Sequence, residues 1–200
     1  MKISGIILAG GKSSRMGKNK ALLEVGGLTM IERVAGAMSG VCSEIIIAGE
    51  NSGTLEHLGY PTVPDIHPGY GPLSGLHAGL KAAKSWYSFV SACDIPFPSE
   101  KLMKRIISEK DGFDVVMLKQ GEFFEPLFSL YSKAFIDAAE ISIKNGVYKV
   151  TAALQHVKWK PVTVSPGEIP DLAKSLTNVN TPVDYEEAKK CFEAEKSSSG

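Results

Sequence analysis

The chain has 200 residues, of which 44% are hydrophobic and 22% are charged, which fits one domain of ordinary size with a buried core. Its 22 basic and 22 acidic residues cancel, which argues against a protein that binds nucleic acid through a general basic excess. No apolar run approaches the ~18 residues of a membrane helix or resembles a secretory leader, and the three cysteines form no zinc pattern. We therefore expect a cytoplasmic protein with reduced thiols and neither nucleic acid nor membrane as a partner.

Apolar strand-like runs alternate with helical patterns along the chain. Strands are predicted over 3–8, 43–48, 86–92, 113–118 and 124–130, with shorter extended pieces at 61–64 and 157–164. Helices are predicted over 72–84, 99–109 and 132–145, as well as after Thr29 and after Thr181. This order predicts an α/β fold, a single Rossmann-like domain with a mostly parallel central sheet and helices on both faces. We place the domain at residues 1–195 and expect residues 196–200 to be a disordered tail.

Two of the predicted helices have clear start signals. Thr29 and Glu32 have the spacing of a capping box. The apolar face of the helix that follows comprises Ile31, Val34, Ala35 and Met38. The last helix begins at Thr181 and Pro182, where a capping residue precedes a first-turn proline.

A glycine-rich, basic segment follows the first predicted strand and ends at Lys20. Its glycines are Gly10, Gly11 and Gly17, and they allow backbone N–H groups to approach an anion closely. Arg15 and Lys20 add positive charge opposite a polyphosphate. The segment therefore predicts a cradle for a nucleoside triphosphate, because ligands of parallel sheets bind at the carboxyl ends of strands.

Two common phosphate-binding loops do not fit this segment. A Walker A loop requires a lysine after its second glycine, whereas Gly11 follows Gly10 here. The dinucleotide fingerprint G-x-G-x-x-G is also missing. The remaining alternative to a triphosphate cradle is a glycine-rich turn with solvated lysines.

Two aspartates follow predicted strands and are candidates for the same site. Asp94 lies where the strand over 86–92 ends, before Pro96, and could ligate Mg²⁺ together with substrate phosphates. The alternative is an aspartate that caps a turn. Asp65 follows Pro64, and its carboxylate could accept from the N–H edge of guanine, or it could only shape a Pro/Gly-rich loop.

Small and amide residues supply further candidates. Glycines in 71–79 could bring a helix N-terminus close to an anion, or they could allow close packing of helix on sheet. The asparagines of 178–180 could hydrogen-bond a polar ring or only shape a turn. The four histidines show no ligand spacing, so we expect each at the surface or in a loop.

The motifs together resemble a known family. The segment from Leu8 to Lys20 reads L-A-G-G-x-S-x-R-M-G-x-x-K and resembles the signature of nucleotidyltransferases that activate sugars, polyols and molybdopterin. Within that superfamily the chain is most similar to molybdenum cofactor guanylyltransferases of the MobA type. Three further segments carry the narrower resemblance: Gly71–Gly75, Glu125–Tyr131 and Asn178–Pro182.

The resemblance implies a role for individual residues. Nucleotide binding is implied for Leu8, Ala9, Gly10, Gly11, Lys20, Asp65 and Asp94. Catalytic roles are implied for Arg15, Lys20 and Asp94, with Asp94 also holding Mg²⁺. Gly75, Asn178 and Asn180 are the implied contacts of the pterin substrate, and Asn51 matches the family only loosely.

The resemblance implies transfer of GMP from GTP to the terminal phosphate of molybdopterin or its molybdenum-loaded form, with cofactor-biosynthesis proteins as partners. A CTP-dependent relative usually has L-A-A-G where this chain has Leu8 to Gly11. Sugar-phosphate relatives usually have threonine-arginine-leucine and a proline before the lysine, where this chain has Ser14-Arg15-Met16 and Asn19. A module that binds nucleotide without chemistry is the non-enzymatic alternative.

Overall fold

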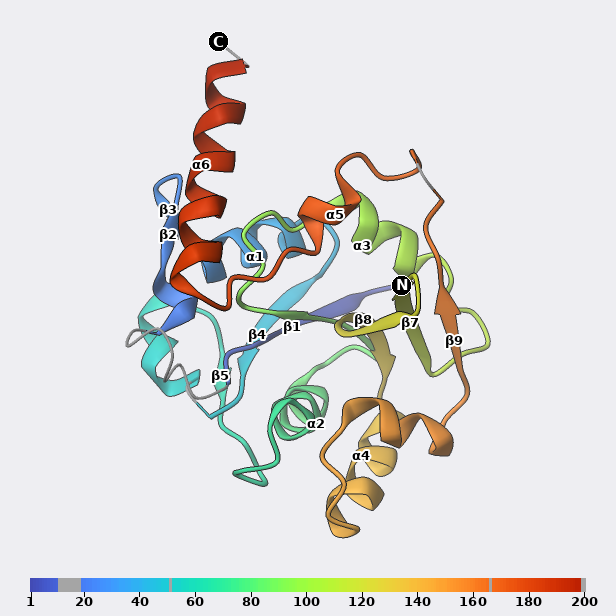
Figure 1. Ribbon diagram of the computed structural model, residues 1–200. Helices are drawn as coiled ribbons and strands as arrows, with labels where there is room; N and C mark the ends of the chain where they lie inside the picture. The colour runs from blue at the N-terminus through green and yellow to red at the C-terminus, as the bar shows by residue number, and fades with distance from the viewer. Residues whose placement is uncertain (11–18, 51, 166, 199–200) are drawn as a thin grey trace.

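The structure is a computed structural model that describes residues 1–10, 19–50, 52–165 and 167–198. Its centre is a seven-stranded sheet with the order β5-β4-β1-β6-β8-β7-β9 (Figure 1). The strands are β1 (Ile3–Leu8), β4 (Glu44–Ala48), β5 (Thr62–Val63), β6 (Tyr87–Ala92), β7 (Val115–Gln120), β8 (Phe123–Ser132) and β9 (Trp159–Val162). Strand β8 runs antiparallel to β6 and β7, and the other described pairs of this sheet are parallel. The predicted α/β fold with a mostly parallel sheet is confirmed.

Helices cover both faces of this sheet. The helices are α1 (Met30–Ser39), α2 (Pro72–Ala82), α3 (Glu100–Ile107), α4 (Phe135–Lys144), α5 (Leu172–Ser175) and α6 (Pro182–Ser198). Short 3₁₀ segments are η2 (Lys20–Leu22), η3 (Ser52–Leu58) and η4 (Val150–His156), and β2 (Glu24–Val25) pairs with β3 (Leu28–Thr29) in a separate hairpin. Helices α1 and α3 lie on one face and α2 and α4 on the other (Figure 1). Among the described residues, none of these helices has the length and apolar composition needed to cross a membrane.

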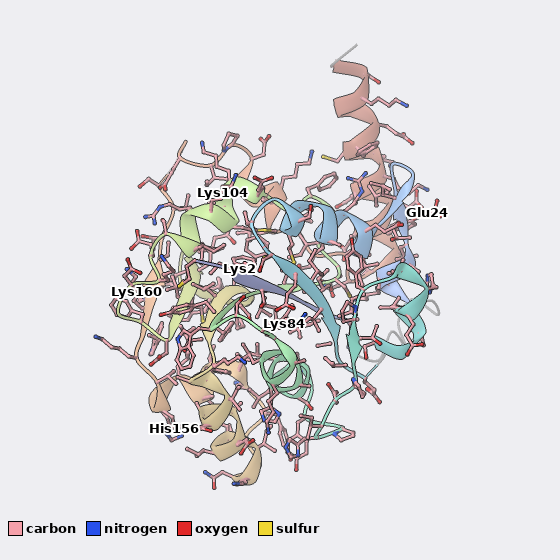
Figure 2. The ribbon with its side chains drawn as sticks, turned by 180° about the vertical axis from the view of Figure 1, so that it is seen from behind. Lys2, Glu24, Lys84, Lys104, His156 and Lys160 are labelled. Atoms are coloured by element: carbon pink, nitrogen blue, oxygen red, sulfur yellow. The ribbon has the colours of Figure 1, made fainter. Side chains whose placement is uncertain are left out.

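The alternation of side chains along β1 explains the two core layers. Ile3 and Ile7 pack into the layer under α1 and α3. Ile6 and Leu8 pack into the layer over α2 and α4. All four are buried, as expected of a parallel strand covered on both faces. Figure 2, a view from behind, shows side chains filling the space on both sides of the sheet.

The register of the parallel strands aligns their carboxyl ends. Leu8 at the end of β1 pairs with Ala48 at the end of β4 and with Ala92 at the end of β6. Ala48 pairs in turn with Val63 at the end of β5. The residues that follow these strands therefore lie along one edge of the sheet, which is where a parallel sheet binds its ligands.

The capping signals act as the sequence predicts. Thr29 Oγ1 accepts from the Glu32 backbone at 3.3 Å, while the Glu32 carboxylate accepts from the Thr29 backbone at 2.8 Å. The predicted apolar face of α1 is buried. At the other end of the chain, α6 continues past residue 195 to Ser198 and extends away from the rest of the molecule (Figures 1 and 2). Ser197 Oγ donates to the Glu193 carbonyl at 3.0 Å, so the helical pattern passes the boundary expected from the sequence.

His77 contradicts the expectation that every histidine lies at the surface or in a loop. It is fully buried within α2, and its Nε2 lies 3.1 Å from Glu140 Oε1 on α4. Burial lowers the pKa of His77, an effect that Glu140 partly opposes. The histidine therefore joins two helices, and a single-sequence pattern could not show this because the partner is distant in the chain.

Candidate functional site

A cavity of about 520 Å³ opens at the aligned carboxyl ends of the strands. Residues that follow β1, β4, β5 and β6 line it, together with the start of α2, the first half of β8 and the segment before α6. The predicted site residues that line it are Leu8, Gly10, Asp65, Gly75, Asp94, Asn178 and Asn180. The sheet topology thus brings residues from widely separated parts of the sequence to one place.

Lys20, Asp94 and Asn180 converge at one side of this cavity. Lys20 Nζ donates to Asn180 Oδ1 at 2.8 Å and lies 4.0 Å from Asp94 Oδ2. The side chains of Lys20 and Asp94 are each 20% exposed. Burial raises the pKa of Asp94, and the Lys20 ammonium partly offsets that rise. The cluster combines a cation, a hard oxygen ligand and an amide within reach of one another, as a phosphate site requires.

The segment that carries the two asparagines is hydrogen-bonded to the backbone of Asp94. The Val179 N–H donates to the Asp94 carbonyl at 2.9 Å, and the Val179 side chain is fully buried. The Asp184 carboxylate accepts from the backbone N–H groups of Asn180 and Thr181, both at 2.8 Å. Because Val179 points into the core, Asn178 and Asn180 remain exposed and line the cavity.

Lys20 owes its position to the turn that begins η2. The Asn19 side chain accepts from the Ala21 N–H at 3.1 Å and caps this short 3₁₀ segment. Ala21 is buried in the core under α1, so Lys20 beside it is held against Asp94 and Asn180, which line the cavity. The sequence identified Lys20 but gave no indication of the Asn19 cap.

Three glycines allow close approach between α2 and the strand ends. Gly49 has φ of +125°, and a Cβ there would lie 3.2 Å from Ala9 C. A Cβ on Gly75 would lie 3.3 Å from Gly49 Cα, and one on Gly79 would lie 2.6 Å from Ile6 Cγ2. The packing alternative therefore holds for both helix glycines, while Gly75 also lines the cavity.

Asp65 lies beside the point where Gly75 of α2 packs against Gly49. A Cβ on Gly75 would lie 3.5 Å from Asp65 Oδ1. That oxygen is buried and has no hydrogen-bond partner among the described residues. Burial, with Glu50 adding repulsion, raises the pKa of Asp65 to about 6. A buried carboxylate oxygen without a partner fits a group that awaits hydrogen-bond donors from a ligand.

Gly11, Arg15 and Asn51 lie outside the described residues. Ala9 donates its N–H to the Ala48 carbonyl at 2.8 Å, so this N–H belongs to the sheet. The Ala9 N–H is therefore not free to donate to a nucleotide.

The sequence reasoning missed two carboxylates and a thiol at the cavity. Glu50 follows β4 and Glu125 lies in β8, and both line the cavity. Cys93 also lines it, but burial raises the pKa of its thiol to about 12, which makes it unreactive. Glu125 could have been noticed as a charged residue inside an apolar run, immediately before a proline.

Comparison with known proteins identifies close relatives. A family described as "MobA-like NTP transferase domain" matches residues 5–158. A "Probable molybdenum cofactor guanylyltransferase" from Pelotomaculum thermopropionicum is 40% identical over 190 residues, covering 94% of this chain and 93% of that protein. A "Molybdenum cofactor guanylyltransferase" from Desulfosudis oleivorans is 36% identical over 200 residues, covering 96% of each chain.

A solved structure is similar over almost the whole chain. It is the crystal structure of "Molybdopterin-guanine dinucleotide biosynthesis protein A" from Archaeoglobus fulgidus. It has a TM-score of 0.82 and 25% sequence identity, and the match covers 96% of this chain and 100% of that one. A cytidylyltransferase from Thermus thermophilus, with a TM-score of 0.70 and 16% identity, shares the fold alone.

Proposed function

Because the chain belongs to the MobA-like NTP transferase family, which matches residues 5–158, we propose that it transfers GMP from GTP to molybdopterin or its molybdenum-loaded form. The acceptor is the terminal phosphate, and the reaction takes place in the cytoplasm. The observation that best supports this proposal is the meeting of Lys20, Asp94 and Asn180 at the strand ends. Relatives that this chain matches over more than nine-tenths of its length are named for the same activity.

The chemistry requires positioning rather than a strong base. An acceptor phosphate monoester is mostly dianionic at neutral pH, since its second pKa is about 6. One of its oxygens attacks the α-phosphorus of GTP, and the bond to the bridging oxygen of the β-phosphate breaks, so that pyrophosphate leaves. The barrier comes from bringing anions together, and preorganised charge lowers it.

The cationic and amide side chains have separate tasks in this scheme. Lys20 neutralises charge on the nucleotide phosphates, and Arg15 is proposed to do the same for the leaving pyrophosphate. Asn180 holds the Lys20 ammonium through its hydrogen bond of 2.8 Å. With Asn178, Asn180 is proposed to contact the acceptor, because both asparagines line the same cavity as Asp94.

Asp65 and the glycines beside it are assigned to the nucleoside. The carboxylate of Asp65 is proposed to accept from the N–H edge of guanine, which adenine lacks. Its buried Oδ1 without a described partner supports this role. Leu8 and Gly10 line the same cavity and allow a base to lie close to the backbone. The family resemblance gives Gly75 to the pterin, but Gly75 lies beside Asp65, so we propose that it contacts the nucleoside instead.

The donor set fits a magnesium ion that is shared with substrate. Within the described ranges, no group of three His, Cys, Asp or Glu side chains is arranged to hold a metal ion. Asp94 supplies one partly exposed carboxylate, and Mg²⁺ is usually held by one or two carboxylates together with substrate phosphates. When bound, the ion would neutralise charge on the phosphates. We propose Mg²⁺ specifically, on the hard oxygen character of Asp94.

The proposal is tested with purified protein, Mg²⁺, molybdopterin and each of the four nucleoside triphosphates in turn. Pyrophosphate release is followed together with formation of the dinucleotide. We expect release with GTP and little with the other three nucleotides. Release with CTP alone would favour a cytidylyltransferase, and no release with any nucleotide would favour a binding module.

A further inference from the structure

The order of the strands divides the cavity into two sides. Asp65 follows β5, and Asp94 follows β6, which lies nearer the middle of the sheet. Glu125 lies on β8, the next strand beyond β6. Asp94 and Lys20 are therefore flanked by Asp65 on one side and Glu125 on the other. Because transfer places the donor and acceptor on opposite sides of the reacting phosphorus, Glu125 belongs to the acceptor side.

Strand β8 departs from regular pairing where it lines the cavity. Leu118 of β7 pairs with Glu125, whereas the neighbouring Met117 pairs with Ser129. Residues 126–128 consequently have no counterpart on β7. Extra residues of this kind re-aim side chains and are frequent beside active sites. Pro126 suits such a position because it has no N–H to give to a sheet.

Two fully buried hydroxyl groups stabilise this bulge. Ser129 Oγ donates to the Glu125 carbonyl at 2.6 Å and accepts from the Leu118 N–H at 3.3 Å. Tyr131 Oη donates to the Pro126 carbonyl at 2.7 Å. The backbone on both sides of the Glu125–Pro126 bond is thus fixed from within the core. A bulge supported in this way presents a defined wall to the cavity.

The Glu125 carboxylate has no described partner that explains its position. It is half-buried on the cavity wall, beside Pro126 and Leu127, and its burial raises its pKa. Its side chain forms no hydrogen bond or ion pair with any residue among those the structure describes. The Glu125 carboxylate is only half-buried and is open to the cavity, so a ligand that supplies donors can replace water there and pair with it.

We propose that Glu125 determines specificity for the acceptor by accepting hydrogen bonds from adjacent N–H groups on the acceptor's heteroaromatic ring. This inference rests on the proposed function, since a pterin presents a ring N–H next to an exocyclic amino group. A carboxylate can accept both in parallel, which fixes the orientation of the ring. The carboxylates at the two ends of the cavity then recognise the two rings of one product, Asp65 the guanine and Glu125 the pterin.

The test compares Glu125→Gln with the wild-type protein and with Glu122→Gln. Glu122 is a matched control because it lies in the turn before β8 and its side chain is 93% exposed. Steady-state dinucleotide formation gives KM for molybdopterin, and calorimetric titration with GTP and Mg²⁺ gives the affinity for nucleotide. We expect Glu125→Gln to raise KM for molybdopterin by about tenfold or more, since hydrogen bonds to a charged group are lost. The affinity of Glu125→Gln for GTP should remain close to that of the wild type. For Glu122→Gln, both the KM for molybdopterin and the affinity for GTP should remain close to wild type.

Direct binding of pterin, followed by its own fluorescence, separates this inference from the function on which it rests. Weaker binding of pterin by Glu125→Gln than by Glu122→Gln supports the inference. If Glu125→Gln has the wild-type KM for molybdopterin and binds pterin as the wild type does, the inference is overturned. The proposed function still stands in that case, provided that the wild-type protein is active. A fall in GTP affinity equal to the change for the acceptor would also overturn it, because Glu125 would then serve the nucleotide or its metal ion. A wild-type protein that forms no dinucleotide would instead refute the proposed function.

Discussion

Lys20 and Asp94 are the residues whose removal should affect chemistry most. Replacing either residue removes a preorganised charge at the reacting phosphates, which typically costs ~3–4 kcal/mol of transition-state stabilisation. We expect Lys20→Ala and Asp94→Ala each to lower kcat for GMP transfer by at least ~100-fold. Steady-state kinetics on variants with unchanged circular dichroism provide the measurement.

A matched control for these variants is Lys189→Ala. Lys189 is another lysine paired with a carboxylate, Glu186 at 3.2 Å, but it lies on α6 away from the strand ends. Its activity should stay within about twofold of wild type, because surface pairs contribute little. Near-normal rates for Lys20→Ala or Asp94→Ala would remove that residue from its assigned role.

Asp65 should make recognition of GTP depend on pH. With a pKa of about 6 in the free protein, its carboxyl group gains a proton as the pH falls through that value. The protonated form no longer accepts two donors from guanine, so kcat/KM for GTP should decrease below about pH 6. Asp65→Asn should show a lower kcat/KM throughout and lack this inflection.

The comparison with Asp65→Asn separates the protein from its substrate. GTP titrates identically with both proteins, so only the difference between the two pH profiles reports Asp65. The two profiles are measured from about pH 5 to about pH 8, on both sides of that pKa. If they have the same shape, Asp65 only shapes its loop.

At the residue scale, the sequence predicted the site residues that stand in local motifs. It did not predict those whose positions depend on contacts between distant strands or helices. Lys20, Asp94 and Asn180 stand in recognisable motifs, and the structure brings them together. Glu125 depends on a bulge defined by β7, and the buried contact of His77 depends on α4. Such relations between distant segments leave no trace in local periodicity.

At the scale of elements, the packing of α2 on β1 depends on Gly79. Its absent Cβ would lie 2.6 Å from Ile6 Cγ2, in a fully buried and β-branched side chain with little freedom to move. We expect Gly79→Ala to lower the free energy of unfolding by about 1–3 kcal/mol, as overpacked cores do. Chemical denaturation measures this change.

Gly36→Ala is the control for that substitution. Gly36 is likewise inside a helix, α1, but it is exposed and a Cβ there would meet nothing within 4 Å. Alanine should therefore stabilise the protein by up to about 1 kcal/mol through helix propensity. If both variants gained stability equally, the close packing of α2 on the sheet would be contradicted.

The main elements were predictable because periodicity and caps are local. The parallel strands, the capping box of α1 and the proline that opens α6 all followed from neighbouring residues. The placement of β8 between β6 and β7, antiparallel to both, is set by long-range pairing. Three serines after a lysine favour a tail over residues 196–200, and helix α6 is described through Ser198.

At the scale of the whole molecule, a ligand that joins several strand ends should stabilise the fold. At a concentration of GTP about 100 times its Kd, binding adds about 2.7 kcal/mol. For a chain of this size that corresponds to a rise in Tm of roughly 5–10 °C. Thermal unfolding with GTP and Mg²⁺ should show this rise, whereas Asp94→Ala should show much less of it. An equal shift for CTP would contradict the assigned base preference.

The central claim is that nucleotide phosphates bind where Lys20 and Asp94 meet at the strand ends. A crystal structure with GTP and Mg²⁺ tests it most directly. We expect the α-phosphate beside Lys20 and Asp94, and the guanine N–H edge against Asp65. A triphosphate bound elsewhere on the molecule, away from the carboxyl ends of β1 and β6, would contradict the account.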